Sequence, residues 1–295
     1  MVAPQPQETA RTVGPPTGGV STGRKSRSRP ELVTEAIFNP LARIVTKALV
    51  PLKVPPPAVV VANAVAGLAA ALAIFRGELV AAALLLQLKT VLDNADGQLA
   101  RARGRTSALG RYLDTEADLV VNAVVFAALA HETGAPLLSA AAFCALTLVL
   151  SANFNADVLY RRTRGESVVT QPPAEEEGRL ARALASFYAA VFAPQDRLFQ
   201  GVSRSRLQRV LTRVSDPEVR DRVTLTYHDG GTVALLSNFG LSSQLFVLGV
   251  CLAFNVPLAY LWLTLVCLAA LPVLELRREV LARRALPGAS EAQPS

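Results

Sequence analysis

The 295-residue chain has few residues that bind soft metals or form covalent cross-links, with only three cysteines and two histidines. Cys144, Cys251 and Cys267 each lie inside an apolar segment, and their spacing suggests neither a metal site nor a disulfide framework. Free cysteines in such surroundings usually behave as small buried hydrophobic residues. The cysteines therefore argue against a thiolate zinc protein and against a disulfide-stapled fold.

Charge and aromatic side chains are also scarce, at 18% and 6% of the residues, whereas 51% are hydrophobic and the mean hydropathy is +0.34. This composition is typical of an integral membrane protein rather than a soluble enzyme. Six apolar segments approach the ~20 residues that a helix needs to cross the hydrocarbon core. We therefore expect an all-α, polytopic membrane protein with six transmembrane helices. The segments begin at Pro57, Leu79, Leu119, Pro136, Thr232 and Pro257.

The N-terminal 30 residues lack the apolar core of a signal peptide, so the first span would direct insertion. This segment is rich in Pro, Gly, Ser and Thr, ends in basic residues, and is expected to be disordered. Residues 31–53 place apolar side chains at near-helical spacing, which predicts an amphipathic helix lying in the membrane interface; a plain packing helix is the alternative.

The remaining chain divides by composition into four parts. Residues 54–160 hold spans one to four, and residues 161–231 form a mixed segment that predicts a small cytoplasmic helical insert. Residues 232–285 hold spans five and six, and residues 286–295 form a short polar tail that we expect to be disordered.

The basic residues predict the orientation, because Lys and Arg are retained on the cytoplasmic side of a membrane protein. The three presumed outer turns contain a single basic residue, Arg76, whereas the other connections and both flanking ends are rich in arginine. Both termini are then cytoplasmic. The net charge of +7 would face anionic lipid headgroups or a phosphorylated substrate. Nucleic acid is not an expected partner, because the basic residues flank spans without interleaved aromatics.

One stretch, Val91 to Asp118, concentrates acidic residues where two predicted spans meet. Asp93 and Asp96 are three residues apart and Asp114 and Asp118 are four apart, so each pair projects from one helix face. A polar turn between the pairs would let an antiparallel hairpin bring all four carboxylates together. Clustered carboxylates repel one another unless cations lie among them. All-oxygen ligands without His or Cys favour Mg²⁺ or Mn²⁺ over zinc.

A surface loop whose acids pair with neighbouring arginines is the alternative interpretation of this stretch. Two observations favour a site instead. The acids begin inside helical segments, where ionisable residues are costly and usually functional. Gly97 and Gly110 accompany them, although a helix prefers Ala by ~1 kcal/mol. Missing side chains on two facing helices would let a planar ligand approach the backbone.

This stretch resembles the signature of the CDP-alcohol phosphotransferase (CDP-alcohol phosphatidyltransferase) family, and every fixed position and spacing is matched over 26 residues. The matching positions are Asp93, Asp96, Gly97, Ala100, Arg101, Gly110, Asp114 and Asp118. The resemblance implies a six-span enzyme that transfers a substituted phosphate from a CDP-linked donor to an alcohol hydroxyl and releases CMP. It also implies two divalent ions held by the aspartates, and a homodimer.

The same resemblance suggests a role for each residue of the motif. Asp93, Asp96 and Asp114 would be the principal metal ligands, and Asp118 the general base and a further ligand. A two-metal site neutralises charge on the attacking and leaving oxygens of such a displacement. The donor would contact Asp96 and a further set of motif residues, in which the glycines make room for the cytidine and the arginine grips the phosphates. This set is Gly97, Ala100, Arg101 and Gly110.

The acceptor, an alcohol, a polyol or a polyol phosphate, is less clearly indicated. Arg161 and Arg162 follow the fourth span and could bind an acceptor phosphate, although they could equally be positive-inside flanks. The chain departs from the family in its long insert and in having Asn63 where a Pro-Asn-x-x-Thr sequence is common. The donor could be CDP-diacylglycerol in phospholipid biosynthesis, or a soluble CDP-polyol. A transporter or assembly protein that uses the acids as an ion pathway is the non-enzymatic alternative.

Overall fold

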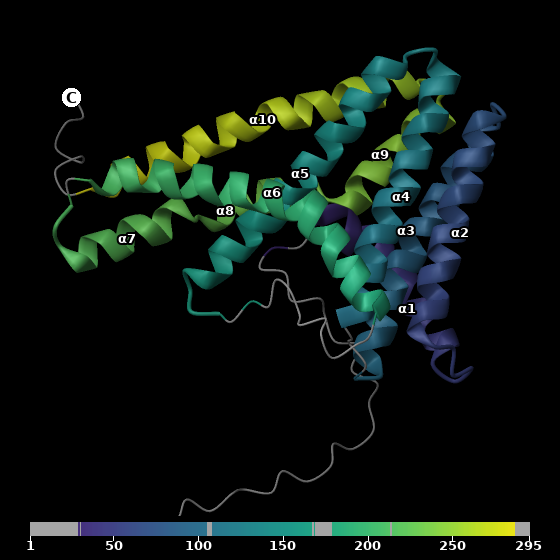
Figure 1. The fold of residues 1–295 in the computed structure, drawn as a ribbon, viewed down its shortest axis with the longest axis horizontal. Coiled ribbons are helices and arrows are strands. Elements are labelled where there is room, and N and C mark those ends of the chain that lie inside the picture. The colour runs from purple at the N-terminus through teal and green to yellow at the C-terminus, as the bar shows by residue number, and fades with distance from the viewer. Residues whose placement is uncertain are drawn as a thin grey trace, which may run out of the picture.

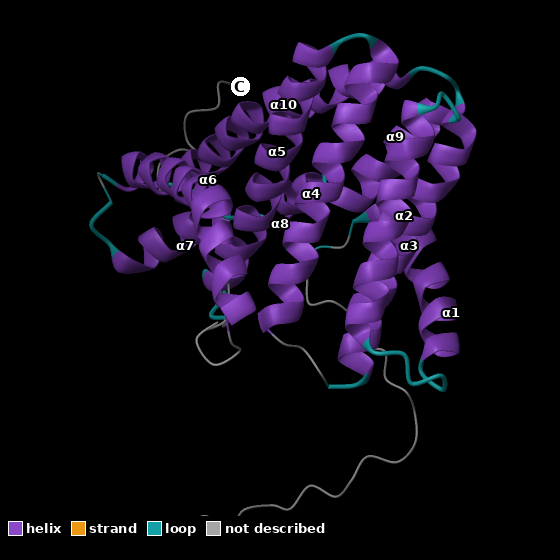
Figure 2. Cartoon of the chain, turned by 45° about the vertical axis from the view of Figure 1, so that its right-hand side comes forward, coloured by secondary structure: helices purple, strands orange, loops and turns teal. Residues whose placement is uncertain are grey.

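The computed structural model describes residues 29, 31–104, 108–166, 168, 179–212 and 214–286, with side chains except at 108–112, 179–181 and 184. Within these residues every regular element is helical (Figures 1 and 2). The predicted disorder of most of residues 1–30 and of the C-terminal tail lies outside the described residues. The helices are η1 (Thr34–Phe38), α1 (Asn39–Leu49), α2 (Pro56–Phe75), α3 (Leu79–Ala102), α4 (Ala108–Thr133), α5 (Pro136–Arg162), α6 (Arg179–Leu211), α7 (Pro217–Tyr227), α8 (Gly230–Ser237), α9 (Leu241–Ala253) and α10 (Pro257–Arg284).

Local sequence explains where several of these helices begin. A proline occupies the first turn of α2, α5, α7 and α10, where its missing N–H removes no helical hydrogen bond. Asp216 caps α7 and Asp229 caps α8, each accepting a hydrogen bond from a backbone N–H of the first turn. The turns that join α2 to α3, α4 to α5 and α9 to α10 lie at one end of the bundle (Figure 2).

Small residues allow the central helices to approach closely. The main buried cluster unites α2, α3, α4, α5, α9 and α10 and is rich in alanine. A Cβ added at Gly249 of α9 would overlap Gln87 of α3, whose Nε2 donates to the Leu245 carbonyl at 3.3 Å. Such close helix contacts through small and polar residues are typical of membrane bundles.

Four segments of the described chain are long and apolar enough to cross a membrane, which is compatible with an integral membrane protein. They are Pro56–Phe75, Pro136–Arg162, Pro217–Ala253 and Pro257–Arg284. The helices α3 and α4 are not among these four segments, because their acidic residues shorten the uncharged part of both helices. The count of six spans therefore stays a prediction.

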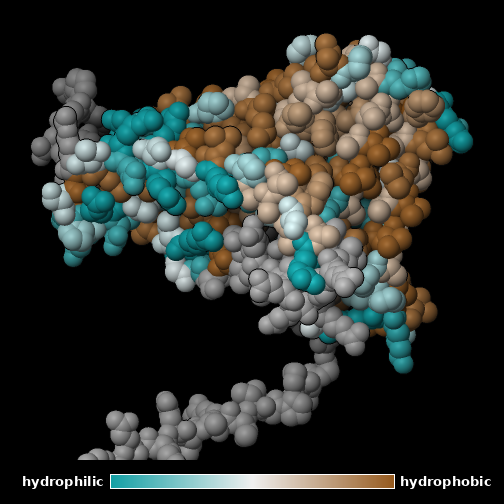
Figure 3. Space-filling view, viewed as in Figure 1, coloured by the Kyte–Doolittle hydropathy of each residue, from teal (hydrophilic) through white to brown (hydrophobic). Residues whose placement is uncertain are grey.

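The surface of the bundle divides into an apolar and a hydrophilic part. Apolar side chains cover the side formed by α2 and its neighbours, whereas hydrophilic residues cover α6, α7 and the end of α10 (Figure 3). Exposed apolar side chains on α2 include Val61, Val65 and Phe75. On α1, Leu41 and Ile44 are also exposed. The interfacial position of the N-terminal helix stays a prediction.

The segment predicted as the fifth span is interrupted. Residues 238–240 separate α8 from α9, and the N-terminal segment is anchored at this break. Glu31, 2% exposed, accepts from the Ser243 N–H in the first turn of α9, and Leu32 N–H donates to Asn238 Oδ1 at 3.0 Å. A Cβ at Gly240 would lie 2.7 Å from Glu31 Oε2, so this close approach requires glycine. The break therefore serves as an attachment site.

The segment between the fourth and fifth predicted spans contains the long helix α6 and the shorter helix α7. Polar contacts fix α6 against α5: Ser151 donates to Gln195 Oε1 at 2.8 Å, and Asn155 Nδ2 donates to Asp196 Oδ1 at 2.6 Å. Since α6 also packs on α4 and α10, it is part of the bundle rather than a separate unit.

Candidate active site

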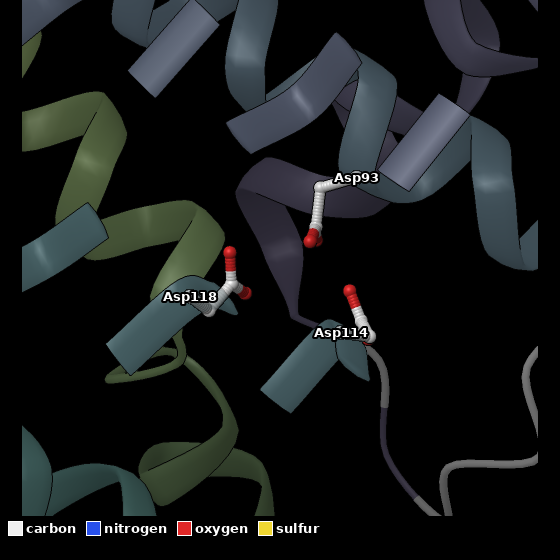
Figure 4. Close-up of side chains that lie close together, drawn as sticks. All are labelled: Asp93, Asp114 and Asp118. Carbon is white, nitrogen blue, oxygen red and sulfur yellow. The ribbon is translucent and has the colours of Figure 1, made fainter. Parts of the chain in front are cut away.

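Three of the four motif aspartates meet between α3 and α4. Asp93 lies in α3, Asp114 and Asp118 lie one turn apart in α4, and one carboxylate oxygen from each lies within 4.8 Å of the others. The three side chains point toward a common centre (Figure 4). The antiparallel arrangement expected from the sequence places them there, because Asp93 faces the first turns of α4.

Asp96 lies outside this group, although it is buried at 6% exposure. Arg101 is close enough for the two charges to interact, and its Nη1 lies 3.2 Å from where a Cβ at Gly97 would be. Gly97 thus provides room beside the guanidinium, whereas Ala100 is half-buried one turn further along α3. Gly110 lies in α4, but its surroundings fall outside the described side chains.

The structure adds a residue that the sequence interpretation missed. Lys89 is completely buried, and its Nζ donates to Asp118 Oδ1 at 2.6 Å. It also interacts electrostatically with Asp93 and Asp114. The signal was present in the sequence, because a lone lysine in an apolar segment is unusual, and Lys89 lies four residues before Asp93 on the same helix face.

α2 completes the surroundings of the cluster. Asn63, buried at 2% exposure, donates from Nδ2 to Asp93 Oδ1 at 3.3 Å. One turn further, a Cβ added at Gly67 would lie 2.3 Å from Val121 Cγ1 and 3.1 Å from Lys89 Cδ. Asn63 therefore orients a motif aspartate, and Gly67 leaves space for the lysine chain between α2 and α4.

The residues present fit a divalent cation. The clustered ligands are all carboxylate oxygens, which hard cations such as Mg²⁺ and Mn²⁺ prefer. Lys89 and Arg101 offset two of the four negative charges of the motif aspartates, so two charges remain to attract cations. Asp93, Asp114 and Asp118 would hold the metal from three sides.

Arg161 and Arg162 lie at the C-terminal end of α5. Arg161 Nε donates to Glu166 Oε2 at 2.7 Å, and Arg162 is exposed. These contacts do not test the role of the two arginines toward an acceptor, so that role stays a prediction. Asp229, at the start of α8, pairs with Arg277 at 3.3 Å.

A carboxylate cluster that could hold a divalent cation lies inside a helical bundle, and four segments of this bundle are compatible with an integral membrane protein. Residues 53–196, which contain the whole motif, match the CDP-alcohol phosphatidyltransferase family. This segment is therefore similar to a family whose members use a CDP-alcohol donor and an alcohol acceptor and typically depend on divalent metal.

Two curated relatives carry the name bifunctional IPC transferase and DIPP synthase. The protein of Thermococcus kodakarensis is 48% identical over 52 residues, which cover 18% of this chain and 12% of the relative. That of Rubrobacter xylanophilus is 34% identical over 94 residues, 32% of this chain and 20% of the relative. The matched segments thus span at most about a fifth of each relative's length. No solved structure is significantly similar to the chain.

Proposed function

We propose that this protein is a metal-dependent membrane enzyme that transfers a substituted phosphate from a CDP-linked donor to an alcohol hydroxyl and releases CMP. The observation that carries the proposal is the convergence of Asp93, Asp114 and Asp118 within a complete family motif. The proposed donor is CDP-diacylglycerol or a similar CDP-alcohol, and the proposed acceptor is a polyol or polyol phosphate. The proposed active site faces the cytoplasm.

In the proposed reaction the acceptor oxygen forms a bond to the donor's distal phosphorus, the bridging P–O bond breaks, and CMP leaves. Asp118 takes the proton from the acceptor hydroxyl. Asn63 holds Asp93 in place, and Lys89 fixes one oxygen of Asp118 so that the other is directed into the site. Arg101, beside Gly97, would bind donor phosphate. Divalent ions would neutralise charge on the pyrophosphate.

The first test follows CMP release by purified protein with a panel of CDP-donors and alcohols, with Mg²⁺ or Mn²⁺ and with excess EDTA. We expect turnover only with metal. Undiminished turnover in EDTA would overturn the metal-dependent mechanism. Activity with CDP-diacylglycerol but not with soluble CDP-polyols would identify a lipid donor, and the reverse would identify a soluble one.

A second test separates binding from chemistry. Asp118→Asn should lose turnover by about 10²- to 10⁴-fold, the usual contribution of a general base, yet retain metal-dependent donor binding, because Asp93 and Asp114 still hold the metal and the amide keeps one oxygen. Asp96→Asn should lose both, because its carboxylate lies beside Arg101, outside the group of three aspartates, and is assigned to the donor. Calorimetric titration with a CDP-donor measures the binding of each variant. If both variants bind alike, the assigned roles are wrong.

The non-enzymatic alternative, a transporter or assembly protein, requires no nucleotide site. It would give no CMP with any donor, while a proteoliposome assay would detect ion movement that depends on the aspartates. The complete motif, including Gly97 and Arg101, favours the enzyme, because an ion pathway has no use for a nucleotide-binding cleft. The predicted homodimer can be measured on the same purified protein by its mass in detergent.

A further inference from the structure

A cavity separate from the aspartate cluster lies between α5, α6, α8 and α10. Its volume is about 510 Å³, within the range of small-molecule sites. Most of its lining is apolar, with leucines from all four helices, whereas Arg206, Glu275 and Arg278 lie at one end. None of the four motif aspartates lines it. The transfer chemistry proposed above does not use this space.

Arg278 is the feature that points to a ligand. The residue is 2% exposed and lines the cavity. Its Nη1 donates to Glu275 Oε1 at 2.8 Å, while Nε and Nη2 have no acceptor among the described residues. Buried donors without an acceptor are destabilising, so they are rare in folded proteins. A buried guanidinium that lines a cavity and has two nitrogens without an acceptor among the described residues fits an anionic oxygen ligand such as a phosphate.

The acidic side chains nearby do not compete for this position. Glu275 is engaged on both oxygens, since Oε2 accepts from Tyr227 OH at 2.9 Å and Oε1 accepts from Arg278. Glu279 accepts from Arg206 at 3.2 Å and from Arg283 at 2.7 Å. Among the residues that line the cavity, the two arginines outnumber the one glutamate, so its polar part carries a net positive charge.

The dimensions of the cavity select the kind of anion. Leu265 and Arg278 line it from positions 13 residues apart on α10, about 20 Å along a helix. One leaflet of a bilayer contributes about 15 Å of hydrocarbon. An apolar lining that follows α10 over this distance and includes an arginine matches an acyl chain joined to a phosphate. A free phosphate would leave the apolar part without a partner.

The cavity also continues toward the surface. Leu198, Val202 and Arg206 of α6 line both the cavity and an adjacent open hollow, to which Arg197 and Arg209 contribute. Leu198 is 55% exposed, so apolar and basic side chains alternate where a lipid would enter. Such a surface suits the boundary between acyl chains and anionic headgroups.

We propose that this cavity binds one molecule of an anionic phospholipid, with an acyl chain between α5 and α10 and the phosphate on Arg278. The site is independent of the transfer reaction. It would secure the α6 insert to the membrane-embedded helices at the level of the headgroups.

Binding can be measured on detergent-purified full-length protein by native mass spectrometry during titration with phosphatidylglycerol, phosphatidylcholine or inorganic phosphate. We expect retention of phosphatidylglycerol, weak retention of phosphatidylcholine, and no displacement of the lipid by phosphate. Arg278→Gln should weaken phosphatidylglycerol binding at least about tenfold. Arg284→Gln is the matched control, because Arg284 is exposed near the end of the same helix and does not line the cavity.

A second variant keeps the test decisive if Arg278→Gln does not fold. Ala152 lines the cavity, so Ala152→Leu adds volume inside it and should also lower phosphatidylglycerol retention. Four results would each overturn the proposal: equal retention of the two lipids, displacement by phosphate, unchanged binding in Ala152→Leu, or an equal loss in Arg284→Gln.

Discussion

At the scale of single residues, the acidic centre includes a cation that the chain itself supplies. Lys89 is completely buried, and Asp118, its partner at 2.6 Å, is 16% exposed in its side chain. Breaking a buried ion pair by removing one partner is strongly destabilising, because the remaining charge lies in a poorly hydrated site. Lys89 therefore stabilises the α3–α4 contact when no metal is bound, and it orients Asp118 when metal is present.

This argument predicts the behaviour of Lys89→Met. Without divalent ions the variant should lose about 3–5 kcal/mol of stability, because several carboxylates then share one site without the lysine. Mg²⁺ or Mn²⁺ should raise its melting temperature more than that of the unmodified protein, since the added cation replaces the missing charge. Thermal unfolding in detergent, with and without metal, measures both effects.

Lys47→Met is a suitable control for that comparison, because Lys47 is exposed in the last turn of α1. It should leave both the stability and the response to metal unchanged. If Lys89→Met melts like the control in EDTA, the lysine is not a structural counterion of Asp118.

The residue scale also shows where sequence reasoning is strong. The spacing of Asp93, Asp114 and Asp118 predicts their convergence, because helical periodicity and one short turn determine which faces meet. The position of Asp96 outside the carboxylate group was not predictable in this way. It depends on the rotation of α3 against α2 and α4, and that rotation is set by packing contacts far apart in sequence.

At the scale of helices, the packing of α2 against α3 and α4 depends on one glycine. A Cβ at Gly67 would overlap Val121 of α4 and press on the Lys89 chain of α3. In α6, by contrast, a Cβ at Gly201 would meet nothing within 4 Å. Both glycines lie inside helices, but only Gly67 is in tight contact with its neighbours. A comparison of the two positions therefore distinguishes the effect of packing from the effect of helix preference.

Substituting each glycine by alanine should therefore give opposite results. Gly67→Ala should destabilise the protein by about 1–3 kcal/mol through overpacking and should lower CMP release by displacing Lys89. Gly201→Ala should stabilise it by up to about 1 kcal/mol, because alanine favours a helix. Melting temperatures of the two variants measured side by side test the difference. Destabilisation of both by the same amount would contradict the packing argument.

The elements differ in how far the sequence predicts them. The helices α2, α5 and α10 follow directly from apolar segments that begin with proline, so the positions where they begin were predictable. The break between α8 and α9 was not, because it depends on Glu31 more than 200 residues away. The sequence predicts helix in the 161–231 segment, but the position of α6 against α5 was not predictable, because it depends on polar contacts between residues about 40 positions apart.

At the scale of the whole molecule, the open question is whether α3 and α4 cross the membrane. They are not among the four segments of the described chain that are long and apolar enough to cross. Yet Val80, Leu84 and Leu88 on α3 are 61%, 67% and 47% exposed, and Val120 on α4 is 55% exposed. Water would meet this apolar surface if the two helices lay outside the bilayer, and large exposed apolar patches are rare in soluble surroundings. Lipid contact is therefore the expected state, as the six-span topology requires.

One position distinguishes the two topologies. With the orientation predicted from the basic residues, the turns after α2 and after α4 face outward in either topology, and the end of α5 faces inward. The α3–α4 connection is cytoplasmic only if both helices cross. Gly104 lies in this connection, is exposed, and has nothing within 4 Å of an added Cβ, although its φ of +61° adds some strain for other residues.

The prediction is therefore tested with Gly104→Cys in a background where Cys144, Cys251 and Cys267 are replaced by alanine. A membrane-impermeant maleimide should label Gly104→Cys only after the membrane is permeabilised, because α3 and α4 cross together and place the connection on the cytoplasmic side with the basic residues. Phe254→Cys, 76% exposed in the turn before α10, should be labelled in intact cells, and Arg162→Cys only after permeabilisation. Labelling of Gly104→Cys in intact cells, with both controls as expected, would place the aspartate cluster at the outer surface and exclude the six-span topology.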